Sequence, residues 1–190
     1  MNSIPVTVDN FIRAESDLYF GNIAKDGGFG KFNHRREPAS IDNQTVIRLN
    51  RDTLYSAAVF DLDAGSVTIT LPNAGTRFMS LQVINQDHYV PAVYYGEGSY
   101  TLDRQRIGTR YLLAGVRTLV DPADPKDVRQ VLALQDAIKV SQRNPGKLEV
   151  PNWDQASQKK VRDALLALGR PCSISRRHSA RRPRSIPSAI

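Results

Sequence analysis

The sequence is poor in the residues that most often carry metal or redox chemistry. Its 190 residues include a single cysteine, Cys172, and three histidines, His34, His88 and His178. One cysteine excludes both an intrachain disulfide and a multi-cysteine metal site, and a zinc site would have to recruit carboxylates. We therefore expect neither a metal site nor a cofactor.

Long hydrophobic runs are also absent. No apolar run approaches the roughly 20 residues that a helix needs to cross a bilayer. The opening residues, MNSIPVTVDNF, lack the basic segment and apolar core of a secretory signal. The sequence as written therefore predicts no membrane span and a cytoplasmic location.

Positive charge is concentrated at one end of the chain. The formal net charge is +7, but six arginines and no acidic residue lie beyond residue 169, so removing these six from +7 leaves +1 for residues 1–169. Residues 170–190 have no hydrophobic period and no helix caps, and we expect them to form a disordered Arg-rich tail. Because no aromatic residue is interleaved to stack on bases, the tail favours non-specific phosphate contacts rather than specific nucleic-acid recognition.

The middle of the chain consists of short runs in which apolar and polar residues alternate. These runs span residues 45–50, 54–60, 67–71, 76–85, 89–95, 99–102 and 111–120. Period-two alternation with β-branched residues predicts half-buried antiparallel strands, and Pro91 makes its run an edge or bulged strand. The connections are too short for the crossover helices of a parallel sheet. An antiparallel sandwich or barrel is predicted.

Helical patterns flank these strands. The first covers residues 7–24, with Thr7 or Asp9 as N-cap. The second begins after Asp124 and continues to about Val140, and the third runs from Asp154 to Gly169. The fold class is therefore mainly β with one N-terminal and two C-terminal helices, in a single domain over residues 1–169.

The first helix carries an apolar face with a carboxylate in it. The face consists of Val8, Phe11, Ile12, Leu18 and Tyr19. Glu15 falls near its centre, where a charge is unfavourable unless it is paired or hydrogen-bonded. Two interpretations remain open: an ion pair with Arg48 or Arg51 that holds the helix to the sheet, or an acid in a pocket.

The densest polar cluster of the strand region is the candidate site. It joins two strands and consists of Asn50, Arg51, Asp52, Thr53 and Tyr55. One interpretation is a buried ion-pair and turn network that sets strand register. The other is the floor of a ligand pocket, in which Arg51 binds an anionic group. Asn50 and Tyr55 would then orient the ligand, Asp52 would fix Arg51, and Glu15 or His88 could act as acid or base.

Four segments resemble domain-of-unknown-function family 1254, a bacterial family. They are VDNFIRAESD (8–17), QTVIRLNRDTLYSAAVFDL (44–62), LPNAGTRFMSLQVINQDHY (71–89) and VRTLVDPADPKDV (116–128), within a resemblance over residues 6–169. The resemblance implies an immunoglobulin-like antiparallel β-sandwich followed by a jelly-roll-like partner domain, named domain of unknown function 1214. Many relatives carry an export signal, which implies a periplasmic or envelope role for full-length members.

The resemblance ends near Arg170. The following Arg-, Pro-, Ser- and Ala-rich residues are typical of a GC-rich gene read out of frame. We hypothesise that a frameshift produced the tail and removed the partner domain. An interface left open in this way would favour self-association.

Two functional classes remain. The first is a non-catalytic binding or structural module of a larger two-domain protein, with a small anionic or sugar-like ligand. The second is the N-terminal part of a hydrolase-like enzyme whose site lies at the interface to the missing jelly-roll domain.

Overall fold

The computed structural model of the chain describes residues 3–40, 42 and 50–169. The elements are α1 (Phe11–Lys25), β1 (Asn33–His34), β2 (Thr53–Asp61), the 3-10 turn η1 (Leu62–Ala64), β3 (Val67–Leu71), β4 (Met79–Asn85), β5 (Ala92–Tyr95), β6 (Gly98–Leu102), α2 (Arg104–Ile107), β7 (Tyr111–Leu119), α3 (Pro125–Asp136), β8 (Lys139–Ser141) and α4 (Gln155–Gly169). The predicted strand over 45–50, except for Asn50, and the predicted tail over 170–190 lie outside the described residues.

The described chain forms two compact units. The first contains residues 3–11 and 151–169, and the second contains residues 12–150. In the first unit, Ile4 pairs with Trp153 in a parallel bridge. The Asp154 carboxylate accepts the backbone N–H of Ser157 at 2.9 Å, which is an N-cap arrangement at the start of α4. The prediction of one domain over residues 1–169 stays a prediction.

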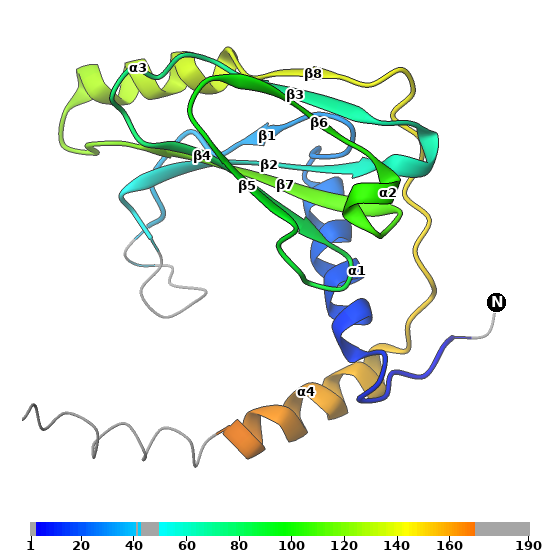
Figure 1. Ribbon diagram of the computed structural model, residues 1–190. Coiled ribbons are helices and arrows are strands. Elements are labelled where there is room, and N and C mark those ends of the chain that lie inside the picture. The colour runs from blue at the N-terminus through cyan, green and yellow to red at the C-terminus, as the bar shows by residue number, and fades with distance from the viewer. Residues whose placement is uncertain (1–2, 41, 43–49, 170–190) are drawn as a thin grey trace, which may run out of the picture. The chain divides into compact units, whose positions relative to one another are not determined.

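The second unit contains two antiparallel sheets. One has five strands in the order β1-β2-β7-β4-β5 and the other has three in the order β6-β3-β8 (Figure 1). β2 and β7 pair over nine residues each. The short β5, next to Pro91, lies at an edge of the five-stranded sheet, where the proline removes no ladder hydrogen bond.

Side chains from both sheets form one apolar core between them. Phe60 of β2, Leu81 of β4 and Val116 of β7 come from the five-stranded sheet, whereas Ile69 of β3 and Leu102 of β6 come from the other. All five are fully buried. Alternate residues of each strand point into this core because successive side chains of a strand face opposite sides.

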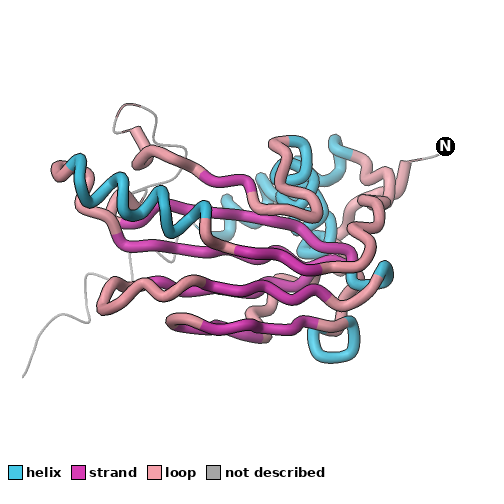
Figure 2. The backbone as a smooth tube through the Cα atoms, turned by 90° about the horizontal axis from the view of Figure 1, so that it is seen from above, coloured by secondary structure: helices cyan, strands magenta, loops and turns pink. Residues whose placement is uncertain are grey.

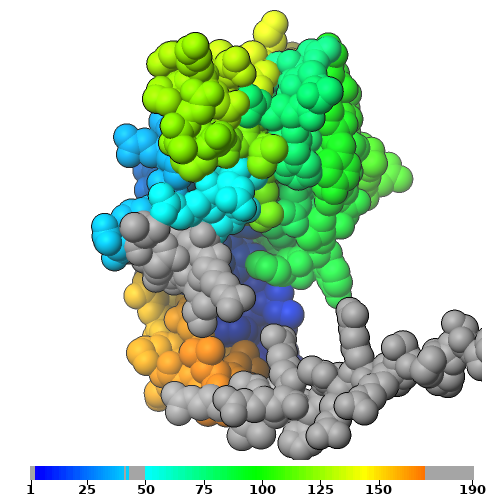
Figure 3. All heavy atoms as spheres, turned by 90° about the vertical axis from the view of Figure 1, so that its left-hand side faces the viewer, coloured from blue at the N-terminus to red at the C-terminus, as the bar shows by residue number. Residues whose placement is uncertain are grey.

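The helices of the second unit lie on opposite sides of the five-stranded sheet. α3 packs at one end of the strands, where Val131 joins Leu54 and Val120 in a smaller core (Figure 2). Figure 3 shows the yellow-green atoms of α3 next to the cyan atoms at the start of β2. α1 stands on the face that points away from the three-stranded sheet, through Phe20, which packs on Val59 and Tyr111 (Figure 1). We call this face the outer face.

The predicted fold class is confirmed. The chain is mainly β, its two antiparallel sheets form a sandwich, and α1, α3 and α4 are the expected N-terminal and C-terminal helices. The second predicted helix, however, ends at Asp136 rather than near Val140. Residues 139–141 instead form β8, and Val140 lies opposite Ile69 of β3. A short apolar pattern fits either structure, and pairing with β3 decides for a strand.

The predicted buried face of the first helix is wrong. Helix α1 begins at Phe11 rather than at residue 7, and Ile12 and Tyr19 are 55% and 54% exposed. The buried face contains Ala14, Ser16, Asp17 and Phe20. Hydropathy misled the prediction because Ser16 and Asp17 are buried by polar contacts with the turn after β4, as described below.

Candidate functional site

A pocket lies at the start of β2 on the outer face. It has a volume of about 310 Å³. Its lining comes from α1, β1, the segment after β1, and β2, namely Ile23, Asp26, Asn33, Arg35, Glu37, Ala39, Asn50, Thr53, Tyr55 and Ala57. We call it the β2 pocket. Thr53, Tyr55 and Ala57 reach it together because they are alternate residues of one strand.

The rim of the β2 pocket carries charges of both signs. Asp26 and Glu37 supply carboxylates and Arg35 supplies a guanidinium, and all three residues are exposed. Among the described residues none of these three forms a salt bridge; the ion pairs of the structure lie elsewhere. The rim can therefore offer hydrogen-bond acceptors and donors to a ligand.

Two buried polar atoms at the start of β2 have no hydrogen-bond partner among the described residues. They are Thr53 Oγ1 and Arg51 Nε. Thr53 is 6% exposed and lines the β2 pocket. Most buried polar groups in native proteins are hydrogen-bonded, so a group without a partner requires a specific explanation. A ligand in the pocket is one such explanation.

The structure brings together part of the predicted site. Asn50 and Tyr55 line the β2 pocket, whereas Arg51 and Asp52 belong to the same segment and are not part of its lining. The Asp52 N–H donates to Asn50 Oδ1 at 2.7 Å. Arg51 forms no salt bridge within the described part of the chain. The other proposed partner of Glu15, Arg48, lies outside the described residues.

The other two predicted residues lie apart from the β2 pocket. Tyr55 is in register with Ser80 of β4 through β7, and His88 follows the far end of β4, beyond Asn85. Five residues from Ser80 to Asn85 correspond to about 17 Å along an extended strand. Glu15 lies eight residues before Ile23 on α1, or about 12 Å along the helix. The six residues therefore form two groups.

His88 belongs to a polar network between α1 and the β4–β5 turn. Its backbone has φ 64°, the only positive φ of a non-glycine among the described residues. Its Nδ1 lies 3.4 Å from Ser16 Oγ, and Arg13 forms a salt bridge with Asp87. Ser16 is fully buried, so its hydroxyl cannot reach a substrate as a nucleophile. The contact positions the turn instead.

Asp17 and Gln86 form the buried centre of this network. They are 2% and 5% exposed. The Gln86 side-chain amide donates to Asp17 Oδ1 at 2.7 Å, and its oxygen accepts the N–H of Tyr111 at 3.1 Å. The Gln86 backbone N–H donates to Thr109 Oγ1 at 3.1 Å. We call these residues, with Ser16 and His88, the turn network, and its role is to attach α1 to the sheet.

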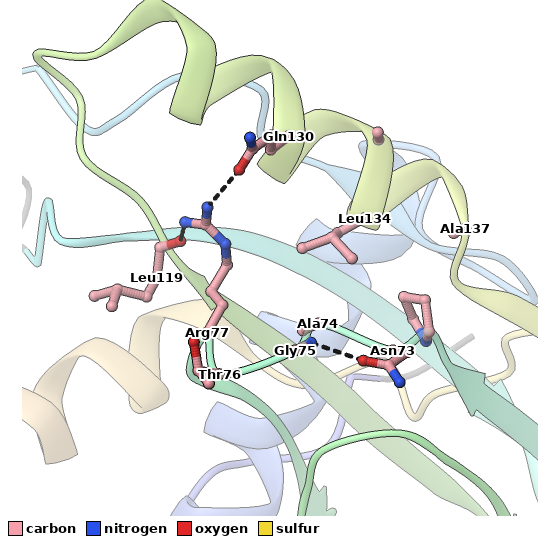
Figure 4. A pocket seen from close by; sticks show the side chains of 11 residues that line it. Asn73, Ala74, Gly75, Thr76, Arg77, Leu119, Gln130, Leu134 and Ala137 are labelled. Carbon is pink, nitrogen blue, oxygen red and sulfur yellow. Dashed lines mark hydrogen bonds between the residues drawn. The ribbon is translucent and has the colours of Figure 1, made fainter.

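A second, open groove lies between the β3–β4 loop and α3 (Figure 4). Its volume is about 850 Å³. Arg77 stands at one end, where its guanidinium donates to Asp127, to the Leu119 carbonyl and to Gln130. The hydrogen bonds from Arg77, with one from the Asp121 N–H, lower the pKa of Asp127 to about 2. Because its cation is fully engaged, this groove is a weaker ligand site than the β2 pocket.

We also searched the described residues for metal-binding clusters and membrane-spanning helices. Within residues 3–40, 42 and 50–169, no group of three or more His, Cys, Asp or Glu residues is arranged to hold a metal ion. None of the helices in these ranges is long and apolar enough to cross a membrane.

Sequence reasoning missed four of the seven polar residues that line the β2 pocket. Asp26, Asn33, Arg35 and Glu37 precede the strand region and are polar, which is also typical of an ordinary surface loop. Only the pairing of β1 with β2, in which Asn33 lies opposite Ala57, shows that these residues reach the pocket. A two-residue strand gives no periodicity from which to predict that pairing.

Comparison with protein-family models gives a match over part of the chain. Residues 29–99 match the model of DUF1254, described as a protein of unknown function. This match confirms the resemblance over that range. No curated protein matches the sequence.

The crystal structure of the VPA0106 protein from Vibrio parahaemolyticus is similar to the chain. The TM-score is 0.55 at 16% identity, and the match covers 75% of this chain and 40% of that chain. At this identity the similarity shows the fold alone. The chain spans well under half the length of that protein.

The segment that matches DUF1254 contains most of the β2 pocket. It begins at Phe29 and therefore includes the pocket residues from Asn33 to Ala57, while Ile23 and Asp26 of the α1 end precede it. The turn network is divided in the same way, because His88 and Gln86 lie inside the matched segment and Ser16 and Asp17 lie outside. The family match alone assigns no activity to either group.

Proposed function

We propose that the described chain is a ligand-binding β-sandwich module that performs no catalysis by itself, and that the β2 pocket is its site. The observation that carries the proposal is Thr53, a pocket residue whose buried hydroxyl has no hydrogen-bond partner within the described part of the chain. A bound hydroxyl, amide or carboxylate would complete this hydrogen bond. Leaving such a group unpaired costs about 1–3 kcal/mol.

The charges of the rim support a sugar-like ligand over an anionic one. Two carboxylates, Asp26 and Glu37, face one guanidinium, Arg35, so a simple anion would meet net repulsion. Hydroxyl groups can donate to the carboxylates and accept from Arg35 and Asn50. The ring of Tyr55, with Arg117 5.3 Å from its centroid, supplies an apolar surface beside these polar groups.

The module would act within a larger protein. The match to VPA0106 leaves 60% of that chain uncovered, since 40% is covered, which supports the presence of a further domain, and the resemblance to family 1254 implies a jelly-roll-like fold for it. A hydrolase-like enzyme with its site at the interface to that domain is the second candidate. His88, an exposed imidazole with φ 64°, is the group that favours it, because strained backbone is enriched at functional sites.

Calorimetric titration of the full chain tests the proposal. Monosaccharides and polyols should bind, and Thr53→Val and Asn50→Ala should weaken binding by about tenfold, the equivalent of one hydrogen bond of about 1.4 kcal/mol. Tyr89→Phe, which changes an exposed tyrosine far along the β4–β5 turn, is the matched control and should bind normally. Equal binding by all four proteins would refute the β2 pocket as the site.

The enzyme alternative has a separate test. A frame-corrected protein that contains the partner domain would be assayed for glycoside and ester hydrolysis beside the full chain. Turnover that depends on both the partner domain and His88 would replace the binding-module proposal. Ligand binding without turnover in both proteins supports it.

A further inference from the structure

The outer face of the five-stranded sheet has a row of residues that begins in the β2 pocket, and its first two members, Ala57 and Gly115, are small. Strand register places Ala57 of β2 opposite Gly115 of β7, Gly115 opposite Gln82 of β4, and Gln82 opposite Val93 of β5. Ala57 is also part of the pocket lining. The row therefore leads from the pocket across four strands, a span of about 14 Å at 4.8 Å per strand.

The centre of this row is open. Among the described residues, its two chain neighbours aside, a Cβ atom added at Gly115 would come within 4 Å of the Gln82 carbonyl oxygen alone, at 3.9 Å. A glycine inside a strand weakens the strand and often marks a place where another group approaches closely. Within the described part of the second unit, the position over Gly115 therefore has room for a side chain or for a group of a ligand.

Larger groups border the row on both sides. On one side, Val59 and Tyr111 are covered by α1 through Phe20, and Leu113 packs against the same cluster. On the other side, Arg117 lies in register with Tyr55, and its guanidinium stands 5.3 Å from the tyrosine ring centroid. The row is therefore a strip of the outer face between α1 and the Tyr55–Arg117 pair, and we call this strip the channel.

Two exposed aromatic rings lie near the β5 end of the channel, on the side of the Tyr55–Arg117 pair. Tyr95 and Phe78 are 67% and 45% exposed, and their ring centroids are 6.1 Å apart at 60°. Tyr95 lies on β5 opposite Ser80. The channel thus combines aromatic rings at its two ends with the amide of Gln82 and the cation of Arg117 between them.

We propose that the β2 pocket and this channel together bind an oligosaccharide chain. The proposal rests on the proposed function, and it extends that ligand from one sugar-like unit to several. Sugar rings present C–H groups, which pack on aromatic rings, and hydroxyls, which pair with amides and guanidinium. The carboxylates of Asp26 and Glu37 at the pocket end disfavour a nucleic acid, and Arg117 at the centre disfavours a protein domain, because interface cores are depleted in charge.

Titration with oligosaccharides of increasing length tests the channel. The probes are malto- and cello-oligosaccharides of one to six units, with Gly-Ser peptides of similar length as a comparison. The wild-type full chain should bind the longer oligosaccharides at least tenfold more tightly than the monosaccharide. Gly115→Val should remove this length dependence and keep monosaccharide affinity, because the new side chain fills the channel and leaves the pocket lining intact.

A second variant and a control keep the outcome interpretable. Tyr95→Ala changes an exposed side chain, so folding should be unaffected, and it should weaken only the longer oligosaccharides by about tenfold. Ser99→Val lies on β6 of the other sheet, where it removes the exposed hydrogen bond between the Ser99 and Thr70 hydroxyls at 2.8 Å, and it should leave the affinity for every oligosaccharide unchanged. Unfolding midpoints of all variants would be measured alongside.

The outcomes separate the two proposals. Equal wild-type affinity for one and for six units, with the pocket variants still weakening it, would overturn the channel and keep the pocket. No binding of any sugar, the monosaccharide included, would overturn the sugar-binding function itself. Length-dependent binding of the peptides in place of the sugars would overturn the oligosaccharide proposal and indicate a peptide-binding face.

Discussion

The outer face of the five-stranded sheet carries two polar clusters, which differ in whether their buried polar atoms have hydrogen-bond partners. In the turn network, Asp17, Gln86 and Tyr111 satisfy one another through hydrogen bonds of 2.7–3.1 Å. In the β2 pocket, Thr53 Oγ1 and the neighbouring Arg51 Nε are buried without partners. A closed network stabilises a fold, whereas a cluster with unused hydrogen-bonding capacity can be completed by a ligand.

The difference follows from what covers each cluster. The turn network lies under the middle of α1, where helix residues reach the β4–β5 turn. The β2 pocket lies beyond the helix end, at a sheet edge where β1 is only two residues long. Polar side chains from the segment after β1 therefore face an open volume of about 310 Å³ rather than one another.

Asp17→Ala should have the largest effect. The variant leaves the buried Gln86 amide without its acceptor, and loss of such a partner costs about 2–3 kcal/mol. Urea unfolding should show this loss in the free energy of unfolding, with an unchanged m-value. Asn22→Ala, on the exposed side of the same helix, is the control and should be within about 0.5 kcal/mol of wild type. An unchanged free energy of unfolding in Asp17→Ala would mean that the turn network does not attach α1 to the sheet.

Asp127→Asn tests a second satisfied cluster, at the base of α3. Arg77 holds the pKa of Asp127 near 2, below the ordinary value of 3.8. A carboxylate with a lowered pKa stabilises the fold above the unfolded pKa, and this contribution is lost as pH falls from about 4 to about 2. Urea midpoints measured across this range should fall more steeply for wild type than for Asp127→Asn. The same dependence of the urea midpoint on pH in both proteins would contradict a lowered pKa at Asp127.

The fold was largely predictable because its signals are local. Runs over 54–60 and 67–71 alternate strictly, and they became β2 and β3 with boundaries within one residue. Asp124 followed by Pro125 marked the start of α3, and the Asp124 carboxylate accepts the Lys126 N–H at 2.8 Å. Such caps and periods act within a few residues, so the sequence alone reveals them.

The candidate site was only partly predictable because it depends on contacts distant in sequence. Asn50 and Tyr55 were named from their polar cluster, but Asp26 and Arg35 enter the pocket through the edge pairing of β1. Hydropathy also placed Ile12 inward on α1, since it cannot anticipate that Gln86 compensates the buried Asp17. Pairings of this kind are tertiary, and residue patterns do not encode them individually.

Thr53→Val should have a small effect of opposite sign. Valine has the shape of threonine without the hydroxyl, so it removes a buried group that lacks a partner, and we expect a gain of up to about 1 kcal/mol in the absence of ligand. Urea unfolding of Thr53→Val and Asp17→Ala under the same conditions measures the free energy of unfolding for both clusters, the β2 pocket and the turn network. A loss above about 1 kcal/mol would show that the Thr53 hydroxyl is satisfied in the folded protein and would remove the contrast between the clusters.

His34 provides the subtlest test, because it lies on β1 behind the pocket. Its Nδ1 is 2.7 Å from Ser56 Oγ. Burial, and then the charge of Arg36, lower its pKa below 6.5, while Asp136 acts in the opposite sense. The unfolded imidazole therefore takes up a proton first, so stability should fall slightly as pH drops through 6.5. Comparing urea midpoints at pH 5 and pH 7.5 would measure this fall, which should be smaller in His34→Gln.

An NMR titration of the imidazole gives an independent reading of the same group. Arg36→Gln removes the nearby cation and should raise the pKa of His34, whereas Asp136→Asn should lower it further. Opposite shifts would show that β1 is held in the described register against β2, with His34 facing Ser56 and Asn33 and Arg35 facing the pocket. Unchanged values in both variants would instead mean that β1 leaves this position, and the pocket rim would then lose the two residues that β1 holds in place.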